Sequence, residues 1–570
     1  MAPTALAYQE PGIVIILIQA SFLLVLNVVG FIFDHVFFCG LVGQVLVGMA
    51  WGTPASQMLS RSFEETVTQL GYLGLILIVF EGGLATSAKS LGSSLLLSIC
   101  VALTGVLLPM ALSFSLAAIS DATNLQAFAA GASLCSTSLG TTFSLLKTTG
   151  MSRSRLGTVL TSAAMLDDVV GLVLVQVISN LGSGHTHISA TTIVRPVTVS
   201  IAFAITLPVA CKFILKPMMR EYSRIPGGGA ECLFAKLGFV FPFHFVLSTT
   251  CLIALATAAS YAGTSILFAA YLAGATVSWI DEVSSKAMVP RTQIAAHAPD
   301  EQENITNAAA GAHGADRQAS ANRPSRPSRD LTPPADDATV GATTNHEAES
   351  DPLPMPLEME SCSIKMYNDY YAPAVDHILK PFFFASIGFS IPISKMFGAR
   401  VIWRGLIYAV LMAIGKLCCG FWLIRFAKPS SSSATTGLAP AAQRSEDKSQ
   451  ARKHKRKRPQ TSPPRPKSLY PGAILGCAMV ARGEIGFLIS ALAATEDIFA
   501  KKELAAAGAE DSDLTSDLYL IVTWAILLCT IVGPLALGFL VKRVKKLQEG
   551  RTQEGGNGMK EDPLGIWGVT

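Results

Sequence analysis

The chain has 570 residues, of which 50% are hydrophobic and 15% are charged, and its mean hydropathy is +0.45. This composition excludes an array of soluble domains and is typical of a polytopic membrane protein. The formal net charge of +4 is small, and no feature indicates a nucleic-acid partner. The sequence shows no phosphate-binding glycine loop, no Cys/His metal spacing and no Ser/His/Asp constellation. We therefore expect neither a cofactor nor enzyme activity.

Thirteen apolar runs are long enough to cross a bilayer, which takes about 20 helical residues. In chain order they are 11–33, 36–52, 69–86, 93–119, 125–147, 156–180, 192–217, 237–260, 262–280, 378–397, 401–425, 470–494 and 516–541. The predicted fold class is an all-α polytopic membrane protein with about 13 transmembrane helices, embedded in the lipid bilayer.

Two polar segments interrupt this array, and their Ala-, Pro- and Ser-rich, charged composition predicts disordered cytoplasmic loops. The expected organisation is helices 1–9 in 1–280, a loop at 281–371, helices 10–11 in 372–426, a basic loop at 427–469, helices 12–13 in 470–541, and a cytoplasmic tail at 542–570.

Lys and Arg near the span ends set the expected orientation. The tail carries Lys542, Arg543, Lys545 and Lys546, whereas the first ten residues carry no Lys or Arg. We therefore expect the N-terminus outside and the C-terminus in the cytoplasm. The membrane itself, plasma membrane or organelle membrane, is left open by the sequence.

Two spans contain residues that are unusual at membrane depth. Residues 131–146 hold two glycines and seven Ser or Thr residues, and residues 472–489 hold four glycines together with Arg482 and Glu484. Such runs indicate broken helices that face a cavity, although a tight packing seam is the alternative for 131–146. Because the two spans lie seven apart, equivalent segments would run in opposite directions. This predicts inverted repeats with two crossed discontinuous helices.

Asp167 and Asp168 lie in the middle of the span 156–180. A carboxylate at the bilayer centre costs roughly 2.5–3.5 kcal/mol on insertion scales, and neighbouring like charges resist joint ionisation. Successive helical residues point about 100° apart, so one acid can face a pathway and the other a neighbouring helix. A pair buried for packing is the alternative. We interpret the two acids as a site for protons and for Na⁺ or K⁺, since hard oxygen ligands suit these ions.

Further charged residues need partners inside the membrane. Lys416 lies well inside the eleventh span and requires one of the two aspartates unless it snorkels to an interface. Glu81 and Arg482 form a second potential pair, which would be a fixed brace because Arg stays charged. Glu484 could replace Glu81 in that pair, or Glu81 could lie in the headgroup region.

These residues together resemble the monovalent cation/proton antiporter superfamily over nearly the whole apolar chain. The motifs are Phe80-Glu81-Gly82-Gly83-Leu84, Thr137-Ser138, Asp167-Asp168, Lys416 after Gly415, and Arg482-Gly483-Glu484. The paired Asp with a downstream membrane Lys is the specific part. The resemblance implies a homodimer with a dimerisation domain and a six-helix core, which carries the site across the membrane by an elevator-like movement.

The resemblance also implies individual roles. Asp168 would be the direct cation ligand and proton acceptor, and Asp167 would pair with Lys416. Thr137 and Ser138 would supply oxygens near the helix break. Glu81 and Arg482 are similar to a structural pair found in other branches of the superfamily. Because the chain has both this pair and the Asp-Asp motif with Lys416, the branch that it resembles is left open.

The expected function is a secondary active antiporter, not an enzyme, that exchanges Na⁺ or K⁺ for protons by alternating access and serves pH homeostasis. Exchange would be electrogenic if both acids titrate. Two alternatives are a sodium-coupled organic-anion symporter of similar architecture and a gated cation channel. The Asp pair with a Lys argues against an anion carrier, which does not obviously need two carboxylates at its centre.

Overall fold

The structure is a computed structural model that describes residues 10–86, 95–138, 140, 151, 154–182, 190–217, 243–288, 362–424, 468–500, 517–553 and 563–568. The secondary structure in these ranges is entirely helical, and the helices, apart from residues 283–288, belong to one compact unit that comprises residues 1–282 and 361–570. Ten stretches within them are long and apolar enough to cross a membrane. The predicted all-α, multi-pass fold class is confirmed.

In chain order the elements are α1 (Ile13–Phe37), α2 (Gly40–Trp51), α3 (Arg61–Leu84), α5 (Leu95–Ser113), α6 (Leu116–Ser120), α7 (Asn124–Ser133), α9 (Arg155–Gly182), α10 (Ala190–Ala210), η2 (Cys211–Leu215), α13 (Phe243–Ala262), α14 (Ile266–Met288), α15 (Cys362–Tyr370), α16 (Ala372–Ala374), η3 (Val375–Leu379), α17 (Lys380–Phe389), α18 (Ile393–Met396), α19 (Ala399–Leu417), η4 (Cys418–Leu423), α20 (Tyr470–Val480), α21 (Glu484–Thr495), α23 (Asp517–Gln553) and η5 (Gly565–Trp567).

The predicted count of thirteen spans is not confirmed, because three of the predicted runs are not among the ten stretches that are long and apolar enough to cross a membrane. The run 36–52 forms α2, which has only 12 residues. The described part of 125–147 holds α7, which has 10 residues and ends at Ser133. The run 378–397 is divided among the end of η3, α17 and α18. Hydropathy detects apolar length, but it does not register where a helix stops within that length.

The predicted loop at 281–371 is shorter at both ends than the sequence indicated. Helix α14 continues to Met288, and α15 begins at Cys362. The Asp281 carboxylate accepts a hydrogen bond of 2.7 Å from the backbone N–H of Ser363, which joins the two flanks of the loop. Residues 289–361 and 425–467 lie outside the described part of the chain. Helix α23 extends to Gln553, well into the predicted tail.

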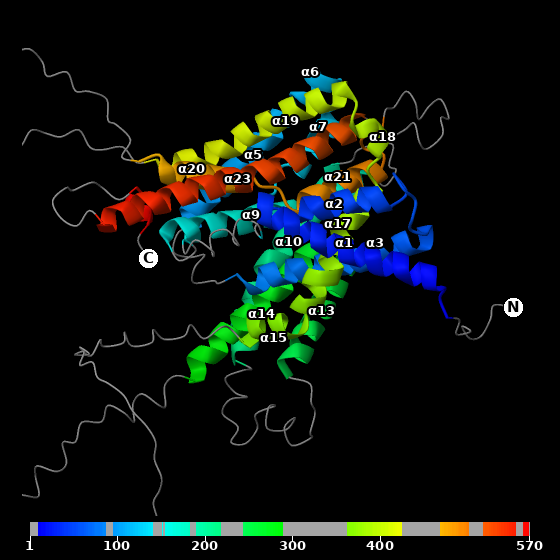
Figure 1. The fold of residues 1–570 in the computed structure, drawn as a ribbon. Helices are drawn as coiled ribbons and strands as arrows, with labels where there is room; N and C mark the ends of the chain where they lie inside the picture. Colours follow the sequence, from blue (N-terminus) through cyan, green and yellow to red (C-terminus); the bar gives the residue numbers. More distant parts are fainter. Residues whose placement is uncertain are drawn as a thin grey trace, which may run out of the picture. The chain divides into compact units, whose positions relative to one another are not determined.

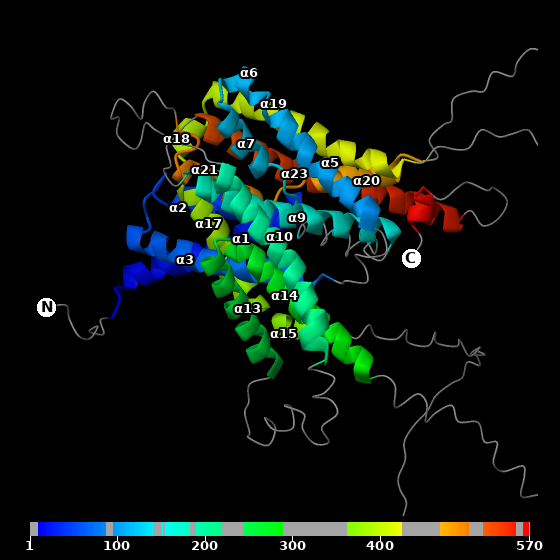
Figure 2. The same ribbon diagram turned by 180° about the vertical axis from the view of Figure 1, so that it is seen from behind.

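The helices pack in two groups. Helices α5, α7, α9, α19, α20, α21 and α23 pack against one another, and we call them the site bundle. In both Figure 1 and Figure 2, α5, α19, α20 and α23 run side by side. Helices α1, α2, α3 and α17 form a second packed group, which we call the scaffold group, and α10 packs along α9. The two acidic residues on α9 therefore belong to the site bundle.

Candidate ion-binding site

Near the centre of the site bundle, one helix ends and another is interrupted. Helix α7 begins with a capping box, in which Thr123 and Gln126 exchange hydrogen bonds between side chain and backbone, and it ends at Ser133. The chain then continues without helix through residues 134–138. Helix α20 ends at Val480, and α21 begins only at Glu484. An unwound backbone at membrane depth must find hydrogen-bond partners within the protein.

The two unwound segments supply partners to each other. The backbone N–H of Ser138 donates to the carbonyl of Ala481 at 2.9 Å, and the Arg482 Nη1 donates to the carbonyl of Ser136 at 2.9 Å. The hydroxyl of Thr530, on α23, donates to the carbonyl of Arg482 at 3.3 Å. The segment that follows α7 therefore contacts the break between α20 and α21, where the sequence predicted that two discontinuous helices cross.

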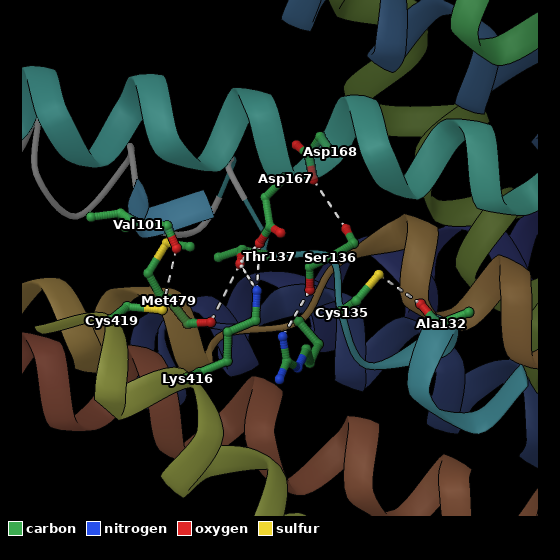
Figure 3. Close-up of polar contacts among 11 residues, drawn as sticks. Val101, Ala132, Cys135, Ser136, Thr137, Asp167, Asp168, Lys416, Cys419 and Met479 are labelled. Atoms are coloured by element: carbon green, nitrogen blue, oxygen red, sulfur yellow. Dashed lines mark hydrogen bonds and ion pairs between the residues drawn. The ribbon is translucent and has the colours of Figure 1, made fainter. Parts of the chain in front are cut away.

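Asp167 and Lys416 form a buried ion pair beside this crossing. Both side chains have zero exposed surface, and the Lys416 Nζ lies 2.5 Å from Asp167 Oδ2. The Thr137 hydroxyl donates to the same carboxylate oxygen at 2.5 Å and accepts from Lys416 at 2.9 Å. Figure 3 shows these three side chains pointing toward one another from α9, α19 and the unwound segment after α7. Lys416 does not snorkel, because its charge is compensated inside the bundle.

Glycine on α5 provides the space for the lysine. A Cβ built on Gly105 would lie 3.3 Å from Lys416 Nζ and 3.2 Å from the terminal methyl of Met479. The carbonyl of Met479, near the end of α20, also lies 3.4 Å from the Thr137 hydroxyl. The ammonium group is thus enclosed by α5, α9, α19 and α20.

Asp168 has a different environment from its neighbour. Its side chain is half-buried, and its Oδ1 accepts a hydrogen bond of 3.0 Å from the Ser136 hydroxyl, as Figure 3 shows. Among the residues that the structure describes, no Lys or Arg forms an ion pair with Asp168. One carboxylate is therefore neutralised by a protein cation, while the adjacent one accepts a hydrogen bond from a hydroxyl and has no cationic partner among the described residues. The second carboxylate can accept a mobile cation or a proton.

Comparison with known proteins agrees with this geometry. The family model of the transmembrane sodium/hydrogen exchangers matches residues 20–293. The chain is similar to the high-affinity Na⁺/H⁺ antiporter NhaS3 of Synechocystis sp., with 33% identity over 143 residues, which is 25% of this chain and 31% of that protein. It is similar to the Na⁺/H⁺-K⁺ antiporter GerN of Bacillus cereus, with 28% identity over 149 residues, which is 26% of this chain and 38% of that protein. The chain thus spans about a third of the length of these curated relatives.

The fold itself is similar over a longer range. The sodium proton antiporter MjNhaP1 of Methanocaldococcus jannaschii aligns with a TM-score of 0.54 at 12% identity, covering 91% of this chain and 98% of that one. The family model, the curated relatives and the shared fold support the resemblance to the monovalent cation/proton antiporter superfamily. The resemblance on which the sequence analysis relied is confirmed.

One expectation taken from the antiporter superfamily is not met by the geometry. The structure does not bring Glu81 and Arg482 together: Arg482 is fully buried, whereas Glu81, in the last turn of α3, is exposed. Glu484, the alternative partner, is half-buried and lies within electrostatic range of both Glu81 and Asp168. Neither carboxylate forms an ion pair with Arg482 in the described part of the chain. A backbone carbonyl takes the place of the expected acid.

Thr137 and Ser138, which the resemblance to antiporters predicted as oxygen ligands, make different contacts in the structure. Thr137 contacts Asp167 through its hydroxyl, while Ser138 contributes its backbone N–H to the crossing. Ser136, which the sequence analysis did not single out, is the residue that contacts Asp168. Its position in the Ser/Thr-rich run was a signal, but the sequence does not show which hydroxyl of consecutive residues faces which acid.

Proposed function

We propose that this chain is a secondary active antiporter that exchanges Na⁺ or K⁺ for protons at Asp168. The observation that carries the proposal is the contrast between the two adjacent carboxylates. Asp167 is neutralised by Lys416 in a fully buried pair, and Asp168 is half-buried and pairs with no Lys or Arg in the described ranges. The names of NhaS3 and GerN support cation/proton exchange, and GerN's name also includes K⁺.

Competition between ion and proton follows from this arrangement. An ionised Asp168 offers a cation one negative charge, and the nearby hydroxyl and carbonyl oxygens of the crossing replace part of its hydration shell. A proton on the same carboxylate removes that charge, so the cation leaves. Because proton and cation use one site, each crosses only when the other has been released, and this coupling defines antiport. Movement of the site bundle against the scaffold group would expose the site to one side at a time.

Transport by the purified protein tests the proposal. The protein is reconstituted into liposomes whose interior is acidic, so that a pH-sensitive dye is quenched. Na⁺ or K⁺ is then added outside. We expect dequenching with at least one of these ions and none for Asp168→Asn. The matched control is Asp121→Asn, which makes the same chemical change at an exposed residue before α7 whose φ of 53° an Asn also tolerates. A wild type that is silent with both ions, or an Asp168→Asn protein that exchanges normally, refutes the proposal.

Stoichiometry needs a separate measurement. If Lys416 leaves Asp167 during the cycle, Asp167 can also take up a proton, and two protons exchange for one cation. Transport would then be electrogenic, and an imposed membrane potential would change its rate. If the Asp167–Lys416 pair stays intact throughout, one proton exchanges for one cation and the rate is insensitive to the potential.

We further propose, from the superfamily resemblance, a homodimer with the N-terminus outside and the C-terminus in the cytoplasm. The mass of the purified protein in detergent tests the dimer. Protease protection of tags at the two ends in sealed vesicles tests the orientation, because an odd number of spans would leave only one tag accessible.

A further inference from the structure

The turn between α1 and α2 carries an aromatic residue in an unusual backbone conformation. Phe38 directly follows α1 and has φ 57° and ψ 31°, in the left-handed region. The other described non-glycine residues with positive φ are polar: Gln57, Asp121 and Asp497. Glycine is the common residue at this position after a helix, because a side chain in the left-handed region costs free energy. A large ring at this position therefore requires a contact that offsets the cost.

The turn is held in place by its own hydrogen bonds. The backbone N–H of Phe38 donates to the carbonyl of Asp34 at 3.0 Å. The carboxylate of Asp34 accepts a further hydrogen bond of 2.6 Å from the backbone N–H of Gly40, the first residue of α2. The backbone of Phe38 is therefore fixed to the scaffold group.

The ring of Phe38 lies against the site bundle. It is half-buried and packs on a cluster of buried apolar side chains, which we call the end cluster. The members of the end cluster include Leu156, Val159 and Leu160 of α9, Ile474, Leu475 and Ala478 of α20, Leu537, Val541 and Val544 of α23, and Leu564 and Trp567 at η5. The ammonium group of Lys542, on α23, lies 5.7 Å from the centroid of the Phe38 ring, a distance at which a cation is attracted to an aromatic face.

We propose that Phe38 is a latch, which holds the scaffold group to the site bundle in the arrangement seen here and leaves the end cluster when the site bundle moves. This inference rests on the movement that alternating access at Asp168 requires. A contact biases a conformational equilibrium only if one state makes it and the other loses it. Phe38 meets this condition, because its backbone belongs to one group and its ring packs on the other.

Distances between the two groups test the latch without a transport assay. Spin labels are attached at Val36→Cys on α1 and Lys546→Cys on α23, both exposed positions, and the distance distribution is measured in the reconstituted protein. We expect a short and a long population. Phe38→Ala raises the ratio of long to short about tenfold, equivalent to about 1.4 kcal/mol. Alanine keeps the Cβ, so the backbone cost is retained and only the ring is removed.

The charge of Lys542 contributes less than the packing of the ring. Lys542→Met keeps the apolar stem and removes the ammonium group, so we expect the ratio of long to short distances to rise about threefold. Lys545→Met, at an exposed position of the same helix, is its control and leaves the ratio unchanged. Equal ratios for the two variants refute the part assigned to Lys542.

Phe31→Ala is the matched control for the ring. It removes an aromatic side chain from the same helix at a position that is 74% exposed, and it leaves the ratio unchanged. Wild type treated with the label gives the background from native cysteines. The latch is refuted if Phe38→Ala gives the same distances as Phe31→Ala.

A reversible link relates the latch to exchange. Phe38→Cys combined with Lys542→Cys is treated with a bifunctional methanethiosulfonate reagent, whose bonds to the two thiols are broken by a reductant. We expect the linked protein to lose most of its exchange in liposomes and to recover it on reduction, while wild type and both single variants keep their rates. A double variant that is fully linked by mass but exchanges normally refutes the latch and leaves antiport standing. A wild type without exchange refutes antiport, and the spin-label distances still decide the latch.

Discussion

Two tightly packed regions of this protein use different chemistry. In the scaffold group, α2, α3 and α17 meet through glycines: a Cβ on Gly48 would overlap the backbone of Ala385, and one on Gly388 would overlap the carbonyl of Val45. We call this contact of α2 with α17 the glycine seam. At the crossing in the site bundle, glycines also allow close approach, as Gly533 does to the backbone of Ala481, but hydrogen bonds and one ion pair are added there.

The difference follows from what each region must do. Lipid tails are as apolar as Leu, so membrane helices gain little from burying apolar surface and associate through close packing of small residues. Helices that meet through such close packing fit together in one arrangement only. Hydrogen bonds of an unwound backbone and an ion pair can exchange their partners for an ion, a proton or water. The polar crossing is therefore suited to binding and release, and the seam to permanent contact.

The largest effect is expected from removing the lysine of the buried pair. Lys416→Met keeps the size of the side chain but leaves Asp167 as an unpaired buried charge, which costs about 3–5 kcal/mol. The Tm of the purified protein should fall strongly, and Lys416→Met combined with Asp167→Asn should recover most of the loss. Lys545→Met, at an exposed position of α23, is the control. A Lys416→Met protein as stable as the wild type would show that the Asp167–Lys416 pair contributes little to the stability of the protein.

The glycine seam should be nearly as sensitive. Gly48→Val forces a side chain against the backbone of α17, and overpacking of this kind costs about 1–3 kcal/mol or more. Gly82→Val, in the last turn of α3, is the control, because a Cβ there meets nothing within 4 Å. Tm measurements should separate the two variants clearly. Equal stability would mean that the seam can open without cost.

Thr137 tests the hydrogen bonds around the pair. Thr137→Val keeps the shape but removes the hydroxyl that contacts Asp167 and Lys416, and an unsatisfied buried polar group costs about 1–3 kcal/mol. Thr137→Ser retains the hydroxyl and should lose much less. The difference between the two Tm values measures the contribution of the hydroxyl to stability. Equal losses would show that Thr137 contributes through packing instead.

The sequence predicted the class of fold and the chemistry of the site because charges at membrane depth are rare. Asp167, Asp168 and Lys416 were recognisable from burial cost alone, and the helix breaks from glycine and hydroxyl content. The pairing of Lys416 with Asp167 was expected only from the resemblance to known antiporters, since both aspartates were possible partners by charge. The structure settles the choice through the orientation of consecutive residues on α9.

Two features could not be predicted from residue types. Arg482 was expected to require an acid, but a carbonyl freed by the unwinding after α7 serves as its partner. The acceptor exists only because the helix is broken, so it has no signature in the sequence. Ser136 was missed for a related reason, because its role depends on which way an unwound residue faces. Backbone geometry, rather than composition, decides both.

The smallest effect is expected at a tyrosine of the site bundle. Tyr408, on α19, is fully buried, and its hydroxyl has no hydrogen-bond partner among the described residues. Tyr408→Phe removes a polar group that gains nothing in this arrangement, so Tm should hardly change or should rise. The matched control is Tyr519→Phe on α23: Tyr519 is also buried, but its hydroxyl lies 3.1 Å from the Ser390 hydroxyl, and losing that bond costs about 0.5–1.5 kcal/mol. If Tyr408→Phe is the more destabilised of the two, its hydroxyl is paired in the stable state. The polar groups of the site bundle would then be held as firmly as the glycines of the seam, and the contrast between the two regions would fail.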